Sequence, residues 1–129
     1  MNKVAVFGLD LEDWYHLDYI KKIDDLNSNF SMLDGFDEYI NILEENKIKS
    51  TIFTVGEIAK QLKKKLMWCS NNGYDIASHT LSHRRPLTLT TDEFIKEIKI
   101  SKNIIEEIIS KKVIGFRAPC FSLNRQYLD

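Results

Sequence analysis

The sequence predicts an α/β protein with a parallel sheet, because strand-like and helix-like segments alternate along its 129 residues. The expected order is strand, helix, strand, helix, strand, helix, strand. Each expected strand is short and apolar, and a polar cluster follows it. Because α/β proteins place their active sites at the carboxyl ends of parallel strands, these polar clusters are the candidate functional residues.

The first half of the chain predicts a helix between two buried strands. The first strand delivers Asp10 to its carboxyl end, and β-branched and aromatic residues indicate the second, which Gly56 closes. Apolar side chains at helical spacing mark the helix, for which Asp34 is available as a cap. A mixed stretch before the helix contains a loop at 27–29. The strand, helix and strand are expected at residues 4–9, 35–46 and 50–55.

The second half predicts a helix ending before Gly73, a short strand, a long helix and a fourth strand. Thr90 and Glu93 have the spacing of a capping box at the start of the long helix. Its apolar stripe is expected to consist of Phe94, Ile98, Ile105 and Ile109. The four elements are expected at residues 57–72, 74–77, 90–110 and 113–116.

Composition excludes several classes of partner. The net charge is -1 at pH 7, so no basic field attracts nucleic acid or anionic lipid. No segment approaches the ~20 apolar residues that span a bilayer, and the N-terminal apolar run is too short for a signal peptide. We therefore expect a cytoplasmic location. Cys69 and Cys120 form no CxxC pair; we expect two buried free thiols, with a disulfide as the alternative.

Asp10-Leu11-Glu12-Asp13 places three carboxylates at the end of the first strand. Their mutual repulsion costs stability unless a cation or an arginine compensates for it. A solvated acidic turn is the simplest interpretation. The functional interpretation assigns one carboxylate to a metal and another to general-base catalysis. In an extended segment, Asp10 and Glu12 lie on one side and Asp13 on the other.

Ser78-His79-Thr80-Leu81-Ser82-His83 contains two histidines four residues apart, which meet on one face of a helical turn and can grip one metal ion. With one carboxylate they make a two-histidine, one-carboxylate site with open positions for water and substrate. The spacing also occurs by chance, and a surface helix start capped by Ser78 is the alternative. The placement after a strand, two strands from the acidic cluster, favours the metal site.

Arg117 follows the last expected strand, where it is either a surface cation or the partner of a carboxylate in a bidentate salt bridge. Trp14, Tyr15 and Phe121 could stack on sugar faces, although packing in the core or at the rim is the commoner role of such aromatics. His16 has no partner at ligand spacing, so we assign it a structural role.

Three segments together resemble the motifs of polysaccharide deacetylases with the NodB homology domain, carbohydrate esterase family 4. They are Gly8-Leu9-Asp10-Leu11-Glu12-Asp13-Trp14, Ser78-His79-Thr80-Leu81-Ser82-His83 and Gly115-Phe116-Arg117-Ala118-Pro119-Cys120-Phe121. Thr51-Ile52-Phe53-Thr54-Val55-Gly56 resembles the strand between the first two. The resemblance spans residues 4–123. The first and third motifs are most similar to members from exopolysaccharide and surface-glycan biosynthesis loci.

The resemblance implies a parallel-stranded (β/α) barrel and a metal-dependent N-deacetylase, a hydrolase of non-peptide carbon–nitrogen bonds. The implied substrate is a glycan, or a glycan precursor, that contains an N-acetylhexosamine. Asp10 is implied to be the catalytic base that deprotonates a metal-activated water, and Arg117 to orient it. The residues expected to contact substrate are Trp14, Pro119 and Phe121.

The same resemblance implies that His79 and His83 bind a divalent metal, usually zinc, together with an acidic residue of the first motif. In the commonest form of the family, the acidic ligand directly follows the base. This chain resembles instead the members with a D-x-D arrangement, in which the ligand lies two residues after the base. Glu12 is therefore the preferred third ligand, and Asp13 is the alternative.

The family takes its general acid from a later histidine motif, and no such motif follows Phe121. Parallel barrels use about thirty residues per strand–helix unit, so this length supplies about four strands. We therefore expect residues 1–129 to be the N-terminal part of one NodB homology domain, inactive as an isolated segment. The open edge of the fourth strand predicts association, either with a second copy or with a complementing C-terminal segment.

Two other functions remain as alternatives. The chain could be a non-catalytic metal- or glycan-binding module, as a remnant or as one subunit of a split enzyme. It could also be another carbon–nitrogen hydrolase of the same fold that needs no metal, although the intact pair His79 and His83 argues against this.

Overall fold

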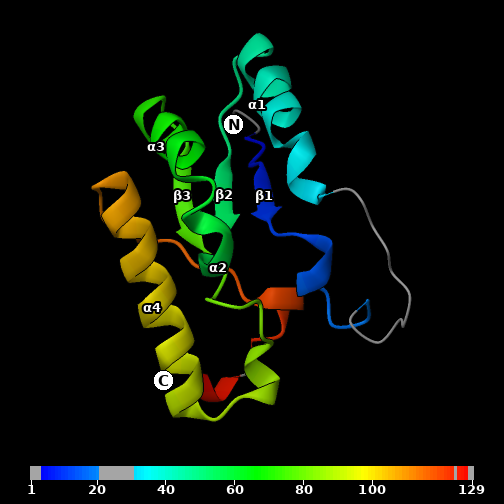
Figure 1. Ribbon diagram of the computed structural model, residues 1–129, viewed down its shortest axis with the longest axis vertical. Coiled ribbons are helices and arrows are strands. Elements are labelled where there is room, and N and C mark those ends of the chain that lie inside the picture. Colours follow the sequence, from blue (N-terminus) through cyan, green and yellow to red (C-terminus); the bar gives the residue numbers. More distant parts are fainter. Residues whose placement is uncertain (1–3, 21–30, 124, 128–129) are drawn as a thin grey trace.

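The computed structural model describes residues 4–20, 31–123 and 125–127, so the loop expected at 27–29 lies outside the described residues. A three-stranded parallel sheet in the order β1-β2-β3 forms its centre (Figure 1). The strands are β1 (Gly8–Leu11), β2 (Thr51–Thr54) and β3 (Asp75–Ser78). The α/β class and the parallel arrangement predicted from the sequence are confirmed.

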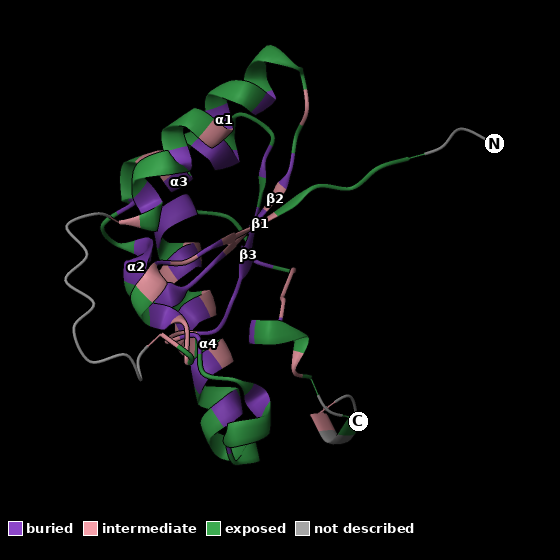
Figure 2. Cartoon of the chain, turned by 90° about the vertical axis from the view of Figure 1, so that its right-hand side faces the viewer, coloured by how far each residue is buried: buried purple, intermediate pink, exposed green. Residues whose placement is uncertain are grey.

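The register of the sheet sorts the strand residues onto two faces. Leu9 pairs with Ile52, which pairs with Ile76, and this row belongs to the hydrophobic core beneath the helices. The next row contains Asp10, Phe53 and Ala77, whose side chains point to the opposite face because successive side chains of a strand alternate. Figure 2 shows the helices gathered on one side of the sheet. Asp10 therefore projects from the face that the helices do not cover.

The described residues form four α-helices; α3 and α4 contact β3, and α4 also contacts α2 and α3. Their bounds are α1 (Phe36–Glu45), α2 (Gly56–Ala59), α3 (Lys63–Asn71) and α4 (Thr91–Ile109). Short 3-10 helices are η1 (Trp14–His16), η2 (Met32–Gly35), η3 (Pro86–Thr88), η4 (Pro119–Phe121) and η5 (Arg125–Tyr127). Across the described segments, no helix has the length and apolar character needed to cross a membrane.

The start of α4 agrees with its prediction. The Thr90 side chain accepts a hydrogen bond from the backbone N–H of Glu93, whose carboxylate accepts one from the backbone of Thr90, as in a capping box. Phe94, Ile105 and Ile109 are buried along the predicted stripe, and Ile98 is half-buried.

Other local predictions were wrong in detail. The helix expected at 57–72 is broken into α2 and α3, which lets α2 pack on α4 while α3 also contacts β3. Asp34 does not cap α1; it lies in η2 and accepts a hydrogen bond from the backbone of Ser31. Residues 4–7 are exposed and lie outside β1. The N-terminal part of the chain runs away from the helices, which therefore do not bury it (Figure 2).

The expected fourth strand is reduced to one β-bridge between Phe116 and Ser78. Ser78 donates from its N–H to the carbonyl of Gly115 and accepts from the N–H of Arg117, both at 3.0 Å. The close approach requires a glycine, since a Cβ on Gly115 would lie 2.9 Å from the Cβ of Ala77. Pairing then stops because the chain turns into η4 at Pro119, which has no N–H to donate.

The two cysteines are free thiols, but only Cys69 is buried; Cys120 is exposed, contrary to the sequence prediction. Burial raises the pKa of the Cys69 thiol to about 11, so this side chain behaves as a small apolar group of the core.

Candidate metal centre

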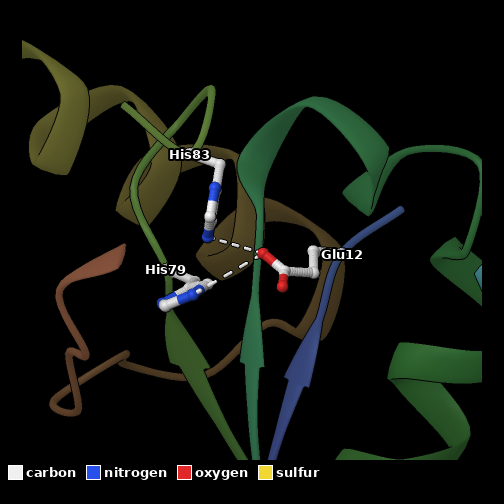
Figure 3. A group of neighbouring side chains, drawn as sticks. All are labelled: Glu12, His79 and His83. Atoms are coloured by element: carbon white, nitrogen blue, oxygen red, sulfur yellow. Dashed lines mark ion pairs between the residues drawn. The ribbon is translucent and has the colours of Figure 1, made fainter. Parts of the chain in front are cut away.

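Glu12, His79 and His83 meet beyond the carboxyl ends of β1 and β3, and their ligand atoms all lie within 4.8 Å of one another (Figure 3). Oε2 of Glu12 lies 2.5 Å from Nε2 of His83 and 3.9 Å from Nε2 of His79. Both imidazoles are buried, and the Glu12 side chain is largely buried. Among the described residues, this is the group with the donor atoms and spacing to hold a metal ion.

The two histidines do not lie on a helical turn, contrary to the sequence prediction. They flank a loop in which Thr80 and His83 adopt left-handed backbone conformations, with φ of 65° and 59°. The loop is tied to the end of β2, because the N–H of His79 donates to the carbonyl of Thr54. It is tied to the start of α2, because the carbonyls of Thr80 and Leu81 accept hydrogen bonds from the N–H groups of Gly56 and Glu57. The ring centroids are nevertheless only 4.9 Å apart.

Backbone carbonyls orient both imidazoles. Nδ1 of His79 lies 2.8 Å from the carbonyl of Arg117, and Nδ1 of His83 lies 3.1 Å from the carbonyl of His16. Because a carbonyl only accepts hydrogen bonds, each Nδ1 carries the proton. This leaves Nε2 of each ring to face Glu12, and Nε2 is the atom with which a histidine held in this way binds a metal.

The surroundings shift the pKa values of the two histidines in opposite directions. Burial is the largest influence on His79 and lowers its pKa below the ordinary 6.5, although the carbonyl of Arg117 and the charge of Asp10 oppose it. Burial also acts on His83, but the hydrogen bond and charge of Glu12 outweigh it and raise the pKa. A carboxylate and an imidazole this close need a proton or a cation between them. Two imidazole nitrogens and a carboxylate oxygen are donors that suit zinc, so the residues fit a divalent ion.

Asp10 lies beside this group with its two oxygens divided between two partners. Oδ1 accepts a hydrogen bond from the guanidinium of Arg117, and Oδ2 lies 3.9 Å from Nε2 of His79. The guanidinium of Arg117 lies 3.8 Å from the ring centre of Phe53 and 5.6 Å from that of Phe121. The arginine therefore holds one carboxylate oxygen and leaves the other facing the histidines.

Asp13, the alternative third ligand, points away from the histidines. Its carboxylate accepts hydrogen bonds from the N–H groups of Trp14 and Met32 and from the hydroxyl of Ser31. Burial acts to raise the pKa of Asp13, but these hydrogen bonds prevail and lower it. The structure thus joins η1 to η2 through Asp13 and places Glu12 at the histidines, as the alternation of an extended chain predicts.

The residues expected to contact substrate are placed unequally. Phe121 is 79% exposed and lies near Arg117, on a backbone with φ of 50°. Trp14 is half-buried and packs edge-on against Tyr15. Pro119 is fully buried at the start of η4, and its contact with substrate stays a prediction.

Sequence analysis missed the parts that His16 and Glu97 play at the site. His16 is buried, and its carbonyl orients His83 while its Nδ1 accepts from the N–H of Asp13. The spacing from Asp13 to His16 is that of a capping box and could have revealed this. Glu97 is buried and accepts hydrogen bonds from Leu81 and Ser82. The position of this carboxylate on the apolar face of α4 is the feature of the sequence that could have indicated a buried role for Glu97.

Comparison with curated proteins shows that chitin deacetylase 1 of Cryptococcus neoformans var. grubii is 31% identical over 80 residues. That alignment covers 62% of this chain and 17% of the fungal protein.

Solved structures share the fold. Peptidoglycan deacetylase PdaC from Bacillus subtilis matches with a TM-score of 0.75 and 19% identity, over 95% of this chain and 52% of the other. A family 4 acetyl xylan esterase from Clostridium thermocellum, in complex with a cobalt ion, has a TM-score of 0.72, 15% identity, and coverages of 95% and 51%. BA3943, a pseudoenzyme from Bacillus anthracis, matches with a TM-score of 0.74 and 19% identity, over 98% of this chain and 39% of the other.

The chain spans about half the length, or less, of the solved chains that it matches. The family model described as polysaccharide deacetylase matches residues 23–129, which is most of the chain. This chain therefore belongs to the polysaccharide deacetylase family.

Proposed function

We propose that this chain carries the metal-binding and base-bearing part of the active site of an N-deacetylase. The proposed substrate is an N-acetylhexosamine-containing glycan or glycan precursor. The observation that carries the proposal is the meeting of Glu12, His79 and His83 beside a carboxylate that an arginine holds. A purely structural role explains neither the convergence of these polar side chains nor the orientation of both imidazoles.

The residues at the site divide the chemistry among them. Nε2 of His79, Nε2 of His83 and Oε2 of Glu12 would hold a divalent cation, proposed to be zinc. When bound, such an ion polarises an amide carbonyl and lowers the pKa of water. Asp10 accepts a proton from the attacking water through the oxygen that faces His79. The guanidinium of Arg117 keeps the Asp10 carboxylate in position.

The proposed substrate class rests on the motifs and on the relatives. The named relatives include a chitin deacetylase and a peptidoglycan deacetylase, beside an acetyl xylan esterase and a pseudoenzyme. The forms of the first and third motifs favour a glycan made for the cell surface. The exposed ring of Phe121 is available to stack on a sugar face next to Asp10 and Arg117.

A non-catalytic metal- or glycan-binding module is the second candidate. One observation favours it: a pseudoenzyme is among the structures with the same fold. The retention of Asp10 and Arg117 beside the three ligand residues favours the enzyme, because metal binding alone does not require them.

The experiment is to measure the acetate released from N-acetylglucosamine oligomers by the full-length protein, with and without zinc. We expect zinc-dependent release from the wild type and none from Asp10→Asn, which keeps the ligand set intact. Zinc binding without acetate release would instead support the non-catalytic module. Equal zinc content in the wild type and in His79→Ala would refute the metal site.

A further inference from the structure

Glu97 projects from α4 into the loop that connects His79 and His83. Its Oε2 accepts hydrogen bonds from the backbone N–H groups of Leu81 and Ser82, both at 2.9 Å. Its Oε1 accepts a third from the hydroxyl of Ser82 at 2.8 Å. The Glu97 residue is only 8% exposed, so these bonds form away from most of the solvent. The two backbone N–H groups and the hydroxyl of residues 81 and 82 are therefore all directed at the carboxylate of Glu97.

The loop needs such a support because its backbone is strained at both sides of this contact. Thr80 and His83 both have positive φ, a conformation that side chains with a Cβ rarely adopt and that β-branched threonine resists most. A carboxylate has two oxygens and only accepts, so it can satisfy three donors at once. Hydrogen bonds of this kind, to an ionised acceptor, are stronger than those between neutral groups.

The helix that carries Glu97 is itself closely fitted to the strand ends. One turn further along α4, the hydroxyl of Ser101 accepts a 2.9 Å hydrogen bond from the hydroxyl of Ser78, at the end of β3. A Cβ added to Gly56 would lie 3.1 Å from the Cα of Ser101, so the helix approaches the start of α2 as closely as a glycine permits. Glu97 therefore reaches the loop from a rigid position.

We infer that Glu97 is a positioning residue, which sets the separation and direction of the two imidazoles before any ion binds. This inference rests on the proposed function, since it presumes that His79 and His83 bind a metal. The remaining anchors of the pair act at other points: carbonyls hold the rings, and β2 and α2 hold the first half of the loop. Glu97 alone among the described side chains bonds to the backbone N–H groups of Leu81 and Ser82. Residues that orient ligands in this way contribute strongly to metal affinity.

The experiment compares zinc affinity, by competition with a chromophoric chelator, for the full-length wild type, Glu97→Ala and Glu97→Gln. The matched control is Glu107→Ala, which removes an exposed carboxylate from the same helix. We expect Glu97→Ala to weaken zinc binding by about 10–100-fold. Glu97→Gln keeps the side-chain shape and one acceptor oxygen, so its loss should be smaller. Glu107→Ala should match the wild type.

A second readout needs no metal. In the zinc-free protein, the amide hydrogens of Leu81 and Ser82 should exchange faster in Glu97→Ala than in the wild type or in Glu107→Ala. If Glu97→Ala does not fold, Glu97→Gln and Ser82→Ala carry the test, because each removes only part of the contact; both should bind zinc less tightly than the wild type.

The outcomes separate this inference from the proposed function. Unchanged zinc affinity in the Glu97 variants, together with lower thermal stability, would show a merely structural carboxylate and overturn the inference alone. A wild type that binds no zinc would overturn the metal site and the inference with it. Weaker zinc binding in the Glu97 variants, with wild-type affinity in Glu107→Ala, supports both.

Discussion

Replacement of Glu12 by glutamine tests whether Glu12, rather than its neighbour Asp13, is the carboxylate ligand of the proposed metal site. Glutamine keeps the length and shape of the side chain but removes the charge that faces both imidazoles at 2.5 and 3.9 Å. The two histidines keep their hydrogen bonds to backbone carbonyls, so the rest of the ligand set stays oriented. The expected result is a protein that folds normally and binds zinc much less tightly.

The size of the effect follows from the number of protein ligands. Structural zinc sites with four protein ligands bind with about 10–16 kcal/mol, or roughly 2.5–4 kcal/mol per ligand. The amide oxygen of glutamine remains a weak ligand, so the lower end of this range applies. A loss of about 2.8 kcal/mol corresponds to a zinc dissociation constant about 100-fold higher.

The assay is a zinc titration against a competing chelator, paired with chemical denaturation of the metal-free protein. The matched control is Asp13→Asn, because Asp13 belongs to the same cluster but bonds to Trp14, Ser31 and Met32. This control should lose about 1–2 kcal/mol of stability and keep its zinc affinity. Lost zinc affinity in Asp13→Asn, with wild-type affinity in Glu12→Gln, would refute the assignment of the ligand.

Three further changes test the surroundings of the site. Arg117→Lys removes the planar group that stacks on Phe53 and holds the base, so acetate release should fall by about 100-fold while zinc affinity stays unchanged. Gly115→Ala places a Cβ 2.9 Å from a side chain of β3 and should cost about 1–3 kcal/mol in denaturation, whereas Gly35→Ala, with open space around it, should not. Hydrogen bonds from a lysine of α4 and a backbone N–H lower the pKa of Glu106 to about 2. Because the folded pKa is below the unfolded 4.5, the stabilisation is present above pH 4.5 and is lost toward pH 2; Glu106→Gln should therefore lower Tm at pH 7, and the difference should vanish in acid.

The sequence was sufficient for the features that depend on local periodicity. Alternation of strand-like and helix-like segments predicted four parallel strands, three of which form the sheet. The period of two along an extended chain predicted that Glu12 and Asp13 would diverge. The capping box at Thr90 was equally local. These predictions held because the residues concerned interact with near neighbours in the chain or follow the geometry of one strand.

Features that depend on contacts between distant segments could not be predicted in the same way. The spacing of His79 and His83 suggested a helical turn, but a loop braced by Glu97 brings the rings together, and nothing in the spacing distinguishes the two. The segment at 113–116 has the composition of a strand, yet it forms a single bridge, from Phe116 to Ser78 at the end of β3, and composition alone does not determine how far two strands pair. Tertiary contacts decided both outcomes.

Arg117 links the proposed base, Asp10, to the proposed metal ligand His79 through two different atoms. Its guanidinium holds Oδ1 of Asp10, while its backbone carbonyl accepts from Nδ1 of His79. The position of the Arg117 backbone is set by the bridge to Ser78, in which the N–H of Arg117 donates to the carbonyl of Ser78. This backbone hydrogen bond does not depend on the side chain at position 117. A change of side chain at this position therefore disturbs the base and spares the imidazole, whereas a displaced backbone disturbs both. If the proposed chemistry takes place, the close contact at Gly115 should therefore affect it, although that glycine contacts neither Asp10 nor the histidines.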